Sequence, residues 1–206
     1  VYVPGVNLIQ RDRNTDEVYL GYSSPKTPSR VYKYNLLNKS KQLVKEQEIP
    51  SGHNKNDYIV ERIEFKSHDG RMVPLTITRH KKTKIDGSAN LLLYGYGSYG
   101  NSMSPSFSST RLSLINRDII WATAHIRGGM EKGMKWWKEG KLTNKKNTFE
   151  DYIYAAKYLI EKNYTSKGKI IGMGGSAGGL LMGAVVNQSP ELFLGVIMAV
   201  PFVDSL

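Results

Sequence analysis

A five-residue stretch has the residue types and the spacing of a nucleophilic serine on a tight turn. Gly174-Gly175-Ser176-Ala177-Gly178 fits the pattern G-x-S-x-G, in which the serine joins a buried strand to a helix. Gly174 and Gly178 lie where a side chain would collide with the neighbouring strand and helix. The turn pushes the Ser176 hydroxyl above the sheet, and the backbone N–H of Ala177 points at the oxygen that becomes negative during acyl transfer. The pattern predicts Ser176 as a nucleophile and Ala177 as an oxyanion donor.

The proton acceptor that such a serine requires does not follow it in the sequence. Enzymes with this turn on a mostly parallel sheet carry their catalytic groups in the chain order serine, acid, histidine. His53, His68, His80 and His125 all precede Ser176, and no histidine follows it. We therefore expect that the triad aspartate and histidine are not in this chain and that His125 is structural. A serine without its base is a weak nucleophile near neutral pH.

Two glycine patterns allow a competing hypothesis, a dinucleotide-binding fold. Residues 95–100 fit the strict dinucleotide fingerprint and residues 172–177 fit its looser form. After residue 100, however, Pro105 and several serines disfavour the helix that must follow. Glu191, the acid at a suitable distance from the second pattern, lies in a Ser-Pro-Glu turn and not at the end of a strand. We therefore expect no nucleotide, no other cofactor and no metal.

From residue 57 onward, the periodicity predicts an α/β domain. Residues 58–67 alternate apolar and polar, and Asp69-Gly70 makes a hairpin turn into a second strand. Strands and helices then alternate, which is typical of a mostly parallel sheet. Strands are expected over 72–79, 90–95, 119–126, 169–172 and 195–200, and helices over 110–116, 148–162 and 177–187. Thr148 and Asp151 fit a capping box at the start of the second helix, whose apolar stripe indicates a packing role.

The first 56 residues differ from the rest of the chain. Short β-like runs over 17–23, 30–34 and 42–48 are separated by turn-rich segments. Strands at this spacing are typical of a meander, a sandwich edge or one propeller blade. The region has few large apolar side chains, so it would make a poor domain alone. We expect it to pack against another part of the protein.

Composition and charge exclude several other classes of protein. The absence of cysteine excludes disulfides, thiol catalysis and cysteine-based zinc sites, and it fits a reducing compartment. No apolar run is long enough for a membrane span and no signal pattern opens the chain, so we expect a cytoplasmic protein without a membrane partner. The net charge is +11, but the lysines are scattered and are not interleaved with aromatic residues. We therefore expect no nucleic-acid partner.

Five motifs in a fixed order carry a family resemblance. They are Tyr94-Gly95-Tyr96-Gly97-Ser98-Tyr99-Gly100, His125-Ile126-Arg127-Gly128-Gly129, Gly174-Gly175-Ser176-Ala177-Gly178-Gly179, Pro190-Glu191-Leu192-Phe193 and Pro201-Phe202-Val203-Asp204. Together they resemble the prolyl oligopeptidase family of serine peptidases, in particular its oligopeptidase B (protease II) branch. The resemblance implies a partial α/β-hydrolase fold: residues 57–206 would be the N-terminal portion of the peptidase domain, and residues 1–56 the remnant of the last β-propeller blade.

The resemblance also implies an activity and residue roles. The protein would hydrolyse short peptides after basic residues through an acyl-enzyme on Ser176, with the Tyr96 hydroxyl as second oxyanion donor. Ser104 and Ser106 stand where oligopeptidase B has two aspartates, which weakens the case for paired basic residues in the substrate. Met130 replaces a third glycine of the family, so the conformation of its loop could differ.

The same resemblance predicts an incomplete active site. Asp204 comes too early to match the triad aspartate of the family. We expect a fragment that lacks the C-terminal part and is active only if that part is present, for instance as a separate C-terminal half that acts as a partner chain. The alternative is a catalytically inactive remnant of such a peptidase.

Overall fold

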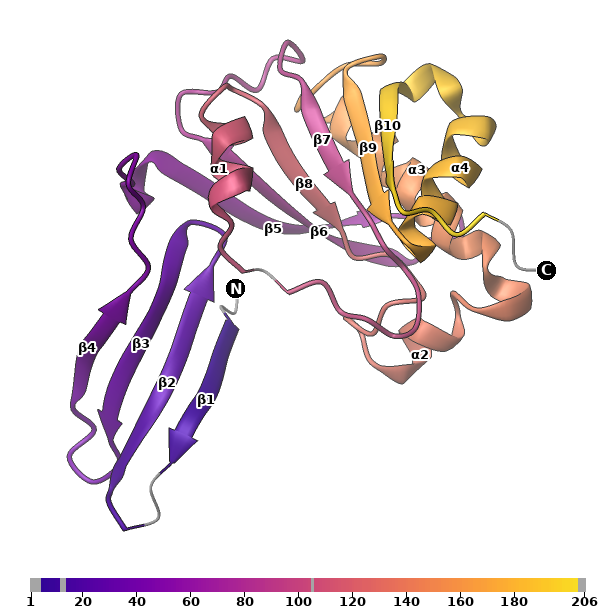
Figure 1. Ribbon diagram of the computed structural model, residues 1–206. Helices are drawn as coiled ribbons and strands as arrows, with labels where there is room; N and C mark the ends of the chain where they lie inside the picture. The colour runs from indigo at the N-terminus through magenta and orange to yellow at the C-terminus, as the bar shows by residue number, and fades with distance from the viewer. Residues whose placement is uncertain (1–4, 12–13, 105, 204–206) are drawn as a thin grey trace.

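Two β-sheets of different character make up the described part of the chain (Figure 1). The computed structural model describes residues 5–11, 14–104 and 106–203, so Pro105 and Asp204 lie outside the described residues. The first sheet is an antiparallel meander of β1 (Gly5–Arg11), β2 (Glu17–Ser24), β3 (Thr27–Asn35) and β4 (Lys41–Glu46). A linker that ends in a 3-10 helix, Lys55–Asp57, leads from it into the second sheet.

The second sheet has six strands in the order β10-β9-β7-β8-β6-β5. They are β5 (Tyr58–Lys66), β6 (Met72–His80), β7 (Leu91–Tyr94), β8 (Ile120–Ala124), β9 (Ile170–Gly175) and β10 (Phe193–Ala199). Strands β10, β9, β7 and β8 run parallel, whereas β6 is antiparallel to both of its neighbours. The predicted α/β class with a mostly parallel sheet is confirmed.

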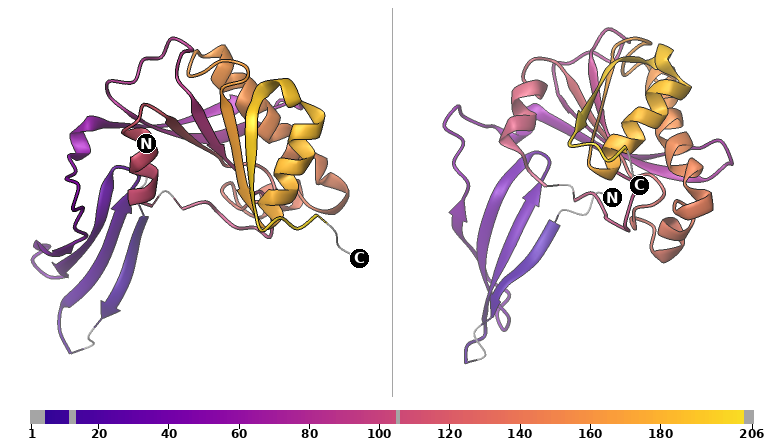
Figure 2. Two further views of the ribbon diagram at one scale, coloured as in Figure 1. Left: turned by 45° about the horizontal axis from the view of Figure 1, so that its top comes forward. Right: turned by 45° about the vertical axis from the view of Figure 1, so that its right-hand side comes forward.

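Helices cover both faces of the six-stranded sheet (Figure 2). The helices are α1 (Ser109–Ile115), α2 (Met134–Lys138), α3 (Lys146–Glu161) and α4 (Ala177–Gln188), with 3-10 turns at Leu142–Asn144 and Pro190–Leu192. Helix α1 packs Leu112 and Ile115 against one face, beside Tyr58 and Trp121. Helices α3 and α4 pack on the other face and enclose the main apolar core. In the described ranges no helix combines the length and the apolar character needed to cross a membrane.

The four-stranded sheet contacts the rest of the chain through the turn between β2 and β3. The Phe107 N–H donates to Ser23 Oγ at 2.9 Å, and His53 Nε2 lies 2.8 Å from the carbonyl oxygen of Lys26. Ser24 and Thr27 of the same turn are buried. The sequence predicted three strands in this region, and the structure adds a fourth, β1, along the edge of β2.

The predicted capping box at the start of α3 is wrong. The helix begins at Lys146, and its cap residue Lys145 makes no side-chain capping bond. The Thr148 hydroxyl instead donates to the carbonyl oxygens of Arg127 (2.8 Å) and Gly140 (3.2 Å). Asp151 is fully buried and accepts hydrogen bonds from Arg127. Both side chains are used by a loop far away in the sequence, so neither is available for the helix end.

Candidate active site

Ser176 lies on the predicted turn between β9 and α4, in a strained backbone conformation. Its φ is 54° and its ψ is −117°, a combination that a residue with a side chain rarely adopts. A Cβ on Gly174 would overlap the backbone of Gly178, at 2.6 Å from its carbonyl carbon, and one on Gly178 would lie 2.9 Å from the carbonyl oxygen of Gly95. The opposing atoms belong to the backbone and cannot move aside. Sterics therefore require glycine at both predicted positions.

The Ser176 side chain is exposed while the backbone around it is anchored. The Ser176 N–H donates to Ala199 at the end of β10 (2.9 Å), and the Ser176 carbonyl oxygen accepts from Phe202 (3.3 Å). Ala177 is buried and begins α4, so its N–H has no partner within the helix and lies at the positive end of the helix dipole. No described residue hydrogen-bonds the Ser176 hydroxyl. The turn thus presents a hydroxyl next to an N–H that the helix leaves unpaired.

A buried tyrosine of α3 supports the strands that lead into the site. The Tyr152 hydroxyl donates to the carbonyl oxygen of Leu93 in β7 at 2.5 Å. A Cβ on Gly95 would lie 2.7 Å from the Tyr152 ring, and one on Gly172 would lie 3.2 Å from its hydroxyl. Complete burial raises the pKa of Tyr152, so the hydroxyl keeps its proton and remains a donor. Helix α3 therefore positions β7 and β9 as well as covering them.

Tyr96 follows β7 and lies against the turn that carries Ser176. A Cβ on Gly178 would lie 3.4 Å from Cδ2 and 3.6 Å from Cα of Tyr96. Because β7 and β9 are neighbouring parallel strands, their carboxyl ends present Tyr96 and Ser176 at the same edge of the sheet. Tyr96 is half-buried, and its hydroxyl makes no hydrogen bond to any described residue. The structure brings Tyr96, Ser176 and Ala177 together; the catalytic roles assigned to them stay predictions.

The turn after Tyr96 packs on the loop at residues 127–129. A Cβ on Gly128 would lie 2.7 Å from the carbonyl carbon of Gly97, and one on Gly140 would lie 2.7 Å from the carbonyl oxygen of Arg127. Gly97 and Gly128 have φ values of 67° and 97°, which favour glycine. The N–H of Gly100 donates to the Gly128 carbonyl oxygen at 2.9 Å. Three backbone segments therefore meet at distances that exclude side chains.

Arg127 holds this loop through a buried ion-pair network. Its Nε and one terminal nitrogen donate to Asp151 at 2.9 and 2.6 Å, and the other terminal nitrogen donates to Asp69 at 2.5 Å. Asp151 also accepts from the Arg127 N–H (3.0 Å) and from the Ser67 hydroxyl (2.6 Å). Burial disfavours the Arg127 charge, but hydrogen bonds to Asp151 and Asp69 outweigh this and raise its pKa. The sequence analysis missed the network, although a carboxylate within the apolar stripe of α3 was a usable signal.

The described residues provide no histidine base for Ser176. The His125 ring is buried: Nε2 lies 2.9 Å from the Thr76 hydroxyl and Nδ1 lies 3.3 Å from Glu131. Burial lowers the pKa of His125 although Glu131 opposes this, so the imidazole is neutral near pH 7. His80 ends β6, which is antiparallel to the parallel strands, and therefore lies at the edge opposite Ser176. Within the described ranges, no three acidic or histidine side chains gather as a metal site requires.

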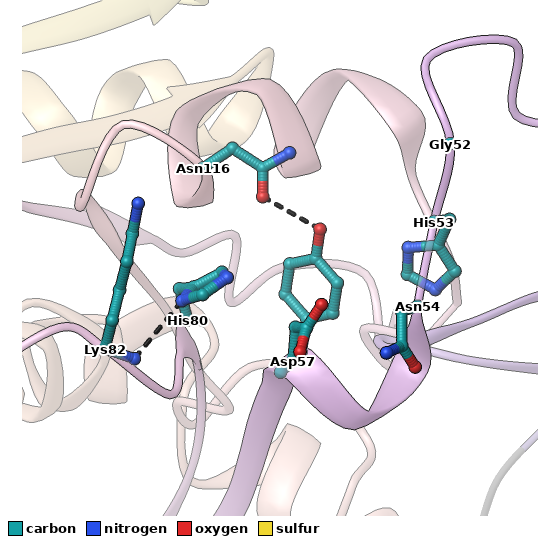
Figure 3. A pocket seen from close by; sticks show the side chains of 8 residues that line it. Gly52, His53, Asn54, Asp57, His80, Lys82 and Asn116 are labelled. Atoms are coloured by element: carbon teal, nitrogen blue, oxygen red, sulfur yellow. Dashed lines mark hydrogen bonds between the residues drawn. The ribbon is translucent and has the colours of Figure 1, made fainter.

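An open pocket of about 470 Å³ lies at that opposite edge (Figure 3). It is lined by Gly52, His53, Asn54, Asp57, Tyr58, His80, Lys82 and Asn116. The Tyr58 ring lies between the two imidazoles, with ring centroids 5.1 Å from His53 and 5.6 Å from His80, and its hydroxyl donates to Asn116 at 2.8 Å. Neither Ser176 nor Tyr96 lines this pocket, so it is separate from the candidate active site.

The predicted departures from the family pattern lie in two segments, the loop before α1 and the loop between β8 and α2. Ser104 and Ser106 are both exposed. The Arg111 guanidinium donates to the Ser106 carbonyl oxygen at 3.2 Å, which brings a positive charge to the segment where an acidic pair was expected. Met130 lies outside the left-handed region of φ, so its position does not require glycine. A Cβ on Gly100 would lie 2.8 Å from Met130 Cε.

Known proteins are similar to this chain in sequence. Residues 105–206 match the prolyl oligopeptidase family. Dipeptidyl aminopeptidase BI of Pseudoxanthomonas mexicana is 43% identical over 194 residues, which is 94% of this chain and 27% of that protein. Protease 2 of Moraxella lacunata is 42% identical over 197 residues, 96% of this chain and 29% of that protein. The chain thus spans less than a third of the length of these relatives.

Solved structures extend the similarity to the fold. Oligopeptidase B from Leishmania major superposes with a TM-score of 0.90 at 38% identity, over 98% of this chain and 29% of that one. The match includes both sheets. It confirms the predicted fold class, part of an α/β-hydrolase fold preceded by a blade of a β-propeller.

Proposed function

Because the chain belongs to the prolyl oligopeptidase family, we propose that it forms the nucleophile-bearing part of a serine oligopeptidase and that Ser176 is its nucleophile. One observation supports this most directly: an exposed serine with a φ of 54° stands between β9 and α4, with glycine required by sterics two residues before and after it. A backbone this strained is retained where its surroundings and function demand it.

The geometry supports a two-step acyl transfer. The Ser176 oxygen bonds to the peptide carbonyl carbon while its proton passes to a histidine supplied by the C-terminal part of the peptidase. The same proton then moves to the departing amine as the C–N bond breaks, which leaves an ester on Ser176. A water hydrolyses that ester and regenerates the hydroxyl. The Ala177 N–H and the Tyr96 hydroxyl donate to the carbonyl oxygen while it is negative.

We further propose that residues 1–56 are the remnant of the last propeller blade and residues 57–206 the N-terminal portion of the peptidase domain. No described strand of one sheet pairs with a strand of the other, and the linker between them ends at Asp57. A propeller over the site would admit short peptides and exclude folded proteins. A cytoplasmic location stays a prediction from the composition.

The proposed substrates are short peptides cleaved after a single basic residue. Exposed hydroxyls at Ser104 and Ser106 cannot neutralise a second cation, and the Arg111 guanidinium on the Ser106 carbonyl would repel one. These contacts support a single basic residue over a pair.

The proposed partner is a separate C-terminal half of the same peptidase. In the described sheet β10 is an edge strand that pairs only with β9. Apolar side chains are exposed on β10 and just after it, at Leu194, Ile197, Met198, Val200 and Phe202. An unpaired edge with exposed apolar residues is a surface that another chain segment can cover.

A fluorophosphonate probe, which reacts with activated serines, tests the proposal. The chain alone should label weakly, and labelling should rise when a C-terminal half carrying the aspartate and histidine is added. Ser176→Ala should abolish the signal, whereas Ser51→Ala, at an exposed serine of the linker, should leave it unchanged. Strong labelling of the chain alone would contradict the missing base. No labelling with the added half would overturn the proposal and favour an inactive remnant.

A further inference from the structure

A partly buried lysine is hydrogen-bonded to the turn that carries Tyr96. Lys145 Nζ donates to the Gly97 carbonyl oxygen at 2.6 Å and to the Ser98 hydroxyl at 2.8 Å. Ser98 is itself buried. None of the ion pairs between described residues includes Lys145, and Nζ makes no hydrogen bond to Ser176. The ammonium group is therefore directed to the turn and not to a carboxylate or the nucleophile.

This position is unfavourable for a lysine in two ways. Removing the ammonium group from water disfavours its charge, and burial lowers the pKa of Lys145 to about 8. Lys145 is also the cap residue of α3, where the positive end of the helix dipole repels a cation. Lys146, the first residue of α3, also lies at the unfavourable end of the dipole, but it is exposed and its charge stays in water. A neutral or acidic residue would suit the helix end better, so the contact with the turn is what a lysine provides here.

The turn needs such an anchor because one of its residues is strained. Tyr99, a residue with a side chain, has a φ of 56°, whereas the φ of 67° at Gly97 is one that glycine adopts without strain. Strained turns keep their shape only where the surroundings hold them. Gly128 packs on one side of the Gly97 peptide, and Lys145 supplies the hydrogen bonds to the same peptide and to the next residue.

We propose that Lys145 is a positioning residue, which fixes Tyr96 against the Ser176 turn by anchoring Gly97 and Ser98. It acts on the oxyanion site through Tyr96 and does not touch the substrate. The consequence for rate rests on the proposed function, whereas the consequence for the turn does not.

Amide hydrogen exchange on the chain itself tests the anchor. In Lys145→Met the amides of Gly100 and Asn101, which donate to the carbonyl oxygens of Gly128 and Ser98, should exchange about tenfold faster or more, because two hydrogen bonds to the turn are lost. Lys145→Arg, which keeps the charge and the donors, should restore most of the protection. Lys146→Met, the matched control, should leave the exchange of these amides unchanged. Amides of β5 and β6 serve as an internal standard for intact folding.

Unchanged exchange at Gly100 and Asn101 in a folded Lys145→Met variant would overturn the proposal. If that variant does not fold, Ser98→Ala is the milder test, since it removes one acceptor and leaves the lysine in place. It should raise exchange at the same amides by a smaller factor. Protection equal to that of the wild type in Ser98→Ala would count against the anchor.

A double-mutant cycle tests the route through Tyr96, with the histidine-bearing half present. Lys145→Met should slow fluorophosphonate labelling of Ser176 by about tenfold or more. In a Tyr96→Phe background the same substitution should add little, because the donor that Lys145 positions is already gone. If the effects of the two substitutions on the labelling rate were fully additive, Lys145 would not act through Tyr96. If the wild type does not label at all, the proposed function fails, and the exchange measurement still decides whether Lys145 anchors the turn.

Discussion

The two sheets of this chain differ in what their side chains bury. In the four-stranded sheet Val18 and Pro28 are the buried apolar residues among those described, and Val6, Leu8, Leu43 and Val44 are 47–61% exposed. In the six-stranded sheet the strand residues that face α3 and α4 are almost completely buried. The strained backbone at Ser176 belongs to the second sheet. A backbone conformation as rare as φ 54° and ψ −117° needs surroundings that do not yield, and the packed second sheet provides them.

One ion pair from each region shows the same contrast. Lys33 pairs with Glu17 at 2.7 Å on the four-stranded sheet, and both side chains are about a third exposed. Arg127 and Asp151 pair beside the six-stranded sheet with 1% and 0% exposure. An exposed pair adds little because water screens it, whereas a buried charge depends on its partner. Removing the acidic partner of an ion pair should therefore lower the free energy of unfolding much more beside the six-stranded sheet than on the four-stranded sheet.

The largest expected difference concerns these ion pairs. Asp151→Ala should lower the free energy of unfolding by about 3–5 kcal/mol, because it leaves the Arg127 charge buried without its main partner. Glu17→Ala should cost at most about 1 kcal/mol. Urea unfolding followed by tryptophan fluorescence measures the first effect, since all three tryptophans lie after residue 57. Amide exchange in β2 and β3 measures the second. Equal losses would remove the contrast between the sheets.

Glycine positions give the next largest contrast. Gly174→Ala should cost about 1–3 kcal/mol or more, because its Cβ would overlap the backbone of Gly178. Gly21→Ala in β2 should change stability by no more than about 0.5 kcal/mol, since its Cβ would meet the exposed side chain of Ile9 at 3.2 Å and the Asn7 carbonyl oxygen at 3.8 Å. Urea unfolding followed by tryptophan fluorescence measures the effect of Gly174→Ala, and amide exchange in β2 and β3 measures that of Gly21→Ala. A tolerated alanine at Gly174 that leaves Ser176 reactive would show that the turn can relax.

Sequence reasoning succeeded where the signal was local. The alternation over β5, the Asp69-Gly70 turn into β6 and the helix after Ser176 were all predicted from neighbouring residues. The glycines around Ser176 indicated the shape of the turn because their spacing reflects steric contacts between adjacent elements. The alternation of strand-like and helix-like segments is a local signal too, so the α/β class could be predicted without knowledge of any tertiary contact.

Sequence reasoning failed where a side chain has a distant partner. Thr148 and Asp151 fit a capping box, yet both bond to the loop around Arg127, and no local pattern shows that choice. Lys145 was counted among the scattered lysines, although it bonds to Gly97 across 48 positions of the sequence. Strand β1 was not predicted, since it is set by its pairing with β2.

The smallest expected effect is a loss of stability at low pH, which should be confined to the six-stranded sheet. Burial opposes the charge of Asp69, but hydrogen bonds from Arg127 outweigh it and hold the pKa of this carboxyl below its usual value of about 4. A lowered pKa in the folded state contributes stability that is complete above about pH 4 and is lost as the pH falls through the folded-state value. The side chain is 34% exposed, so the contribution is modest.

Asp69→Asn should therefore lower the urea midpoint by a constant amount above about pH 5, and the difference from the wild type should shrink below about pH 4. Asp16→Asn, at an exposed residue just before β2, should leave the tryptophan-detected profile unchanged at every pH. A difference for Asp69→Asn that stays constant down to pH 2 would mean that its carboxylate does not stabilise Arg127 through charge. In that case Asp151 alone would carry the electrostatic part of the network, and the contrast between the sheets would depend on a single buried ion pair.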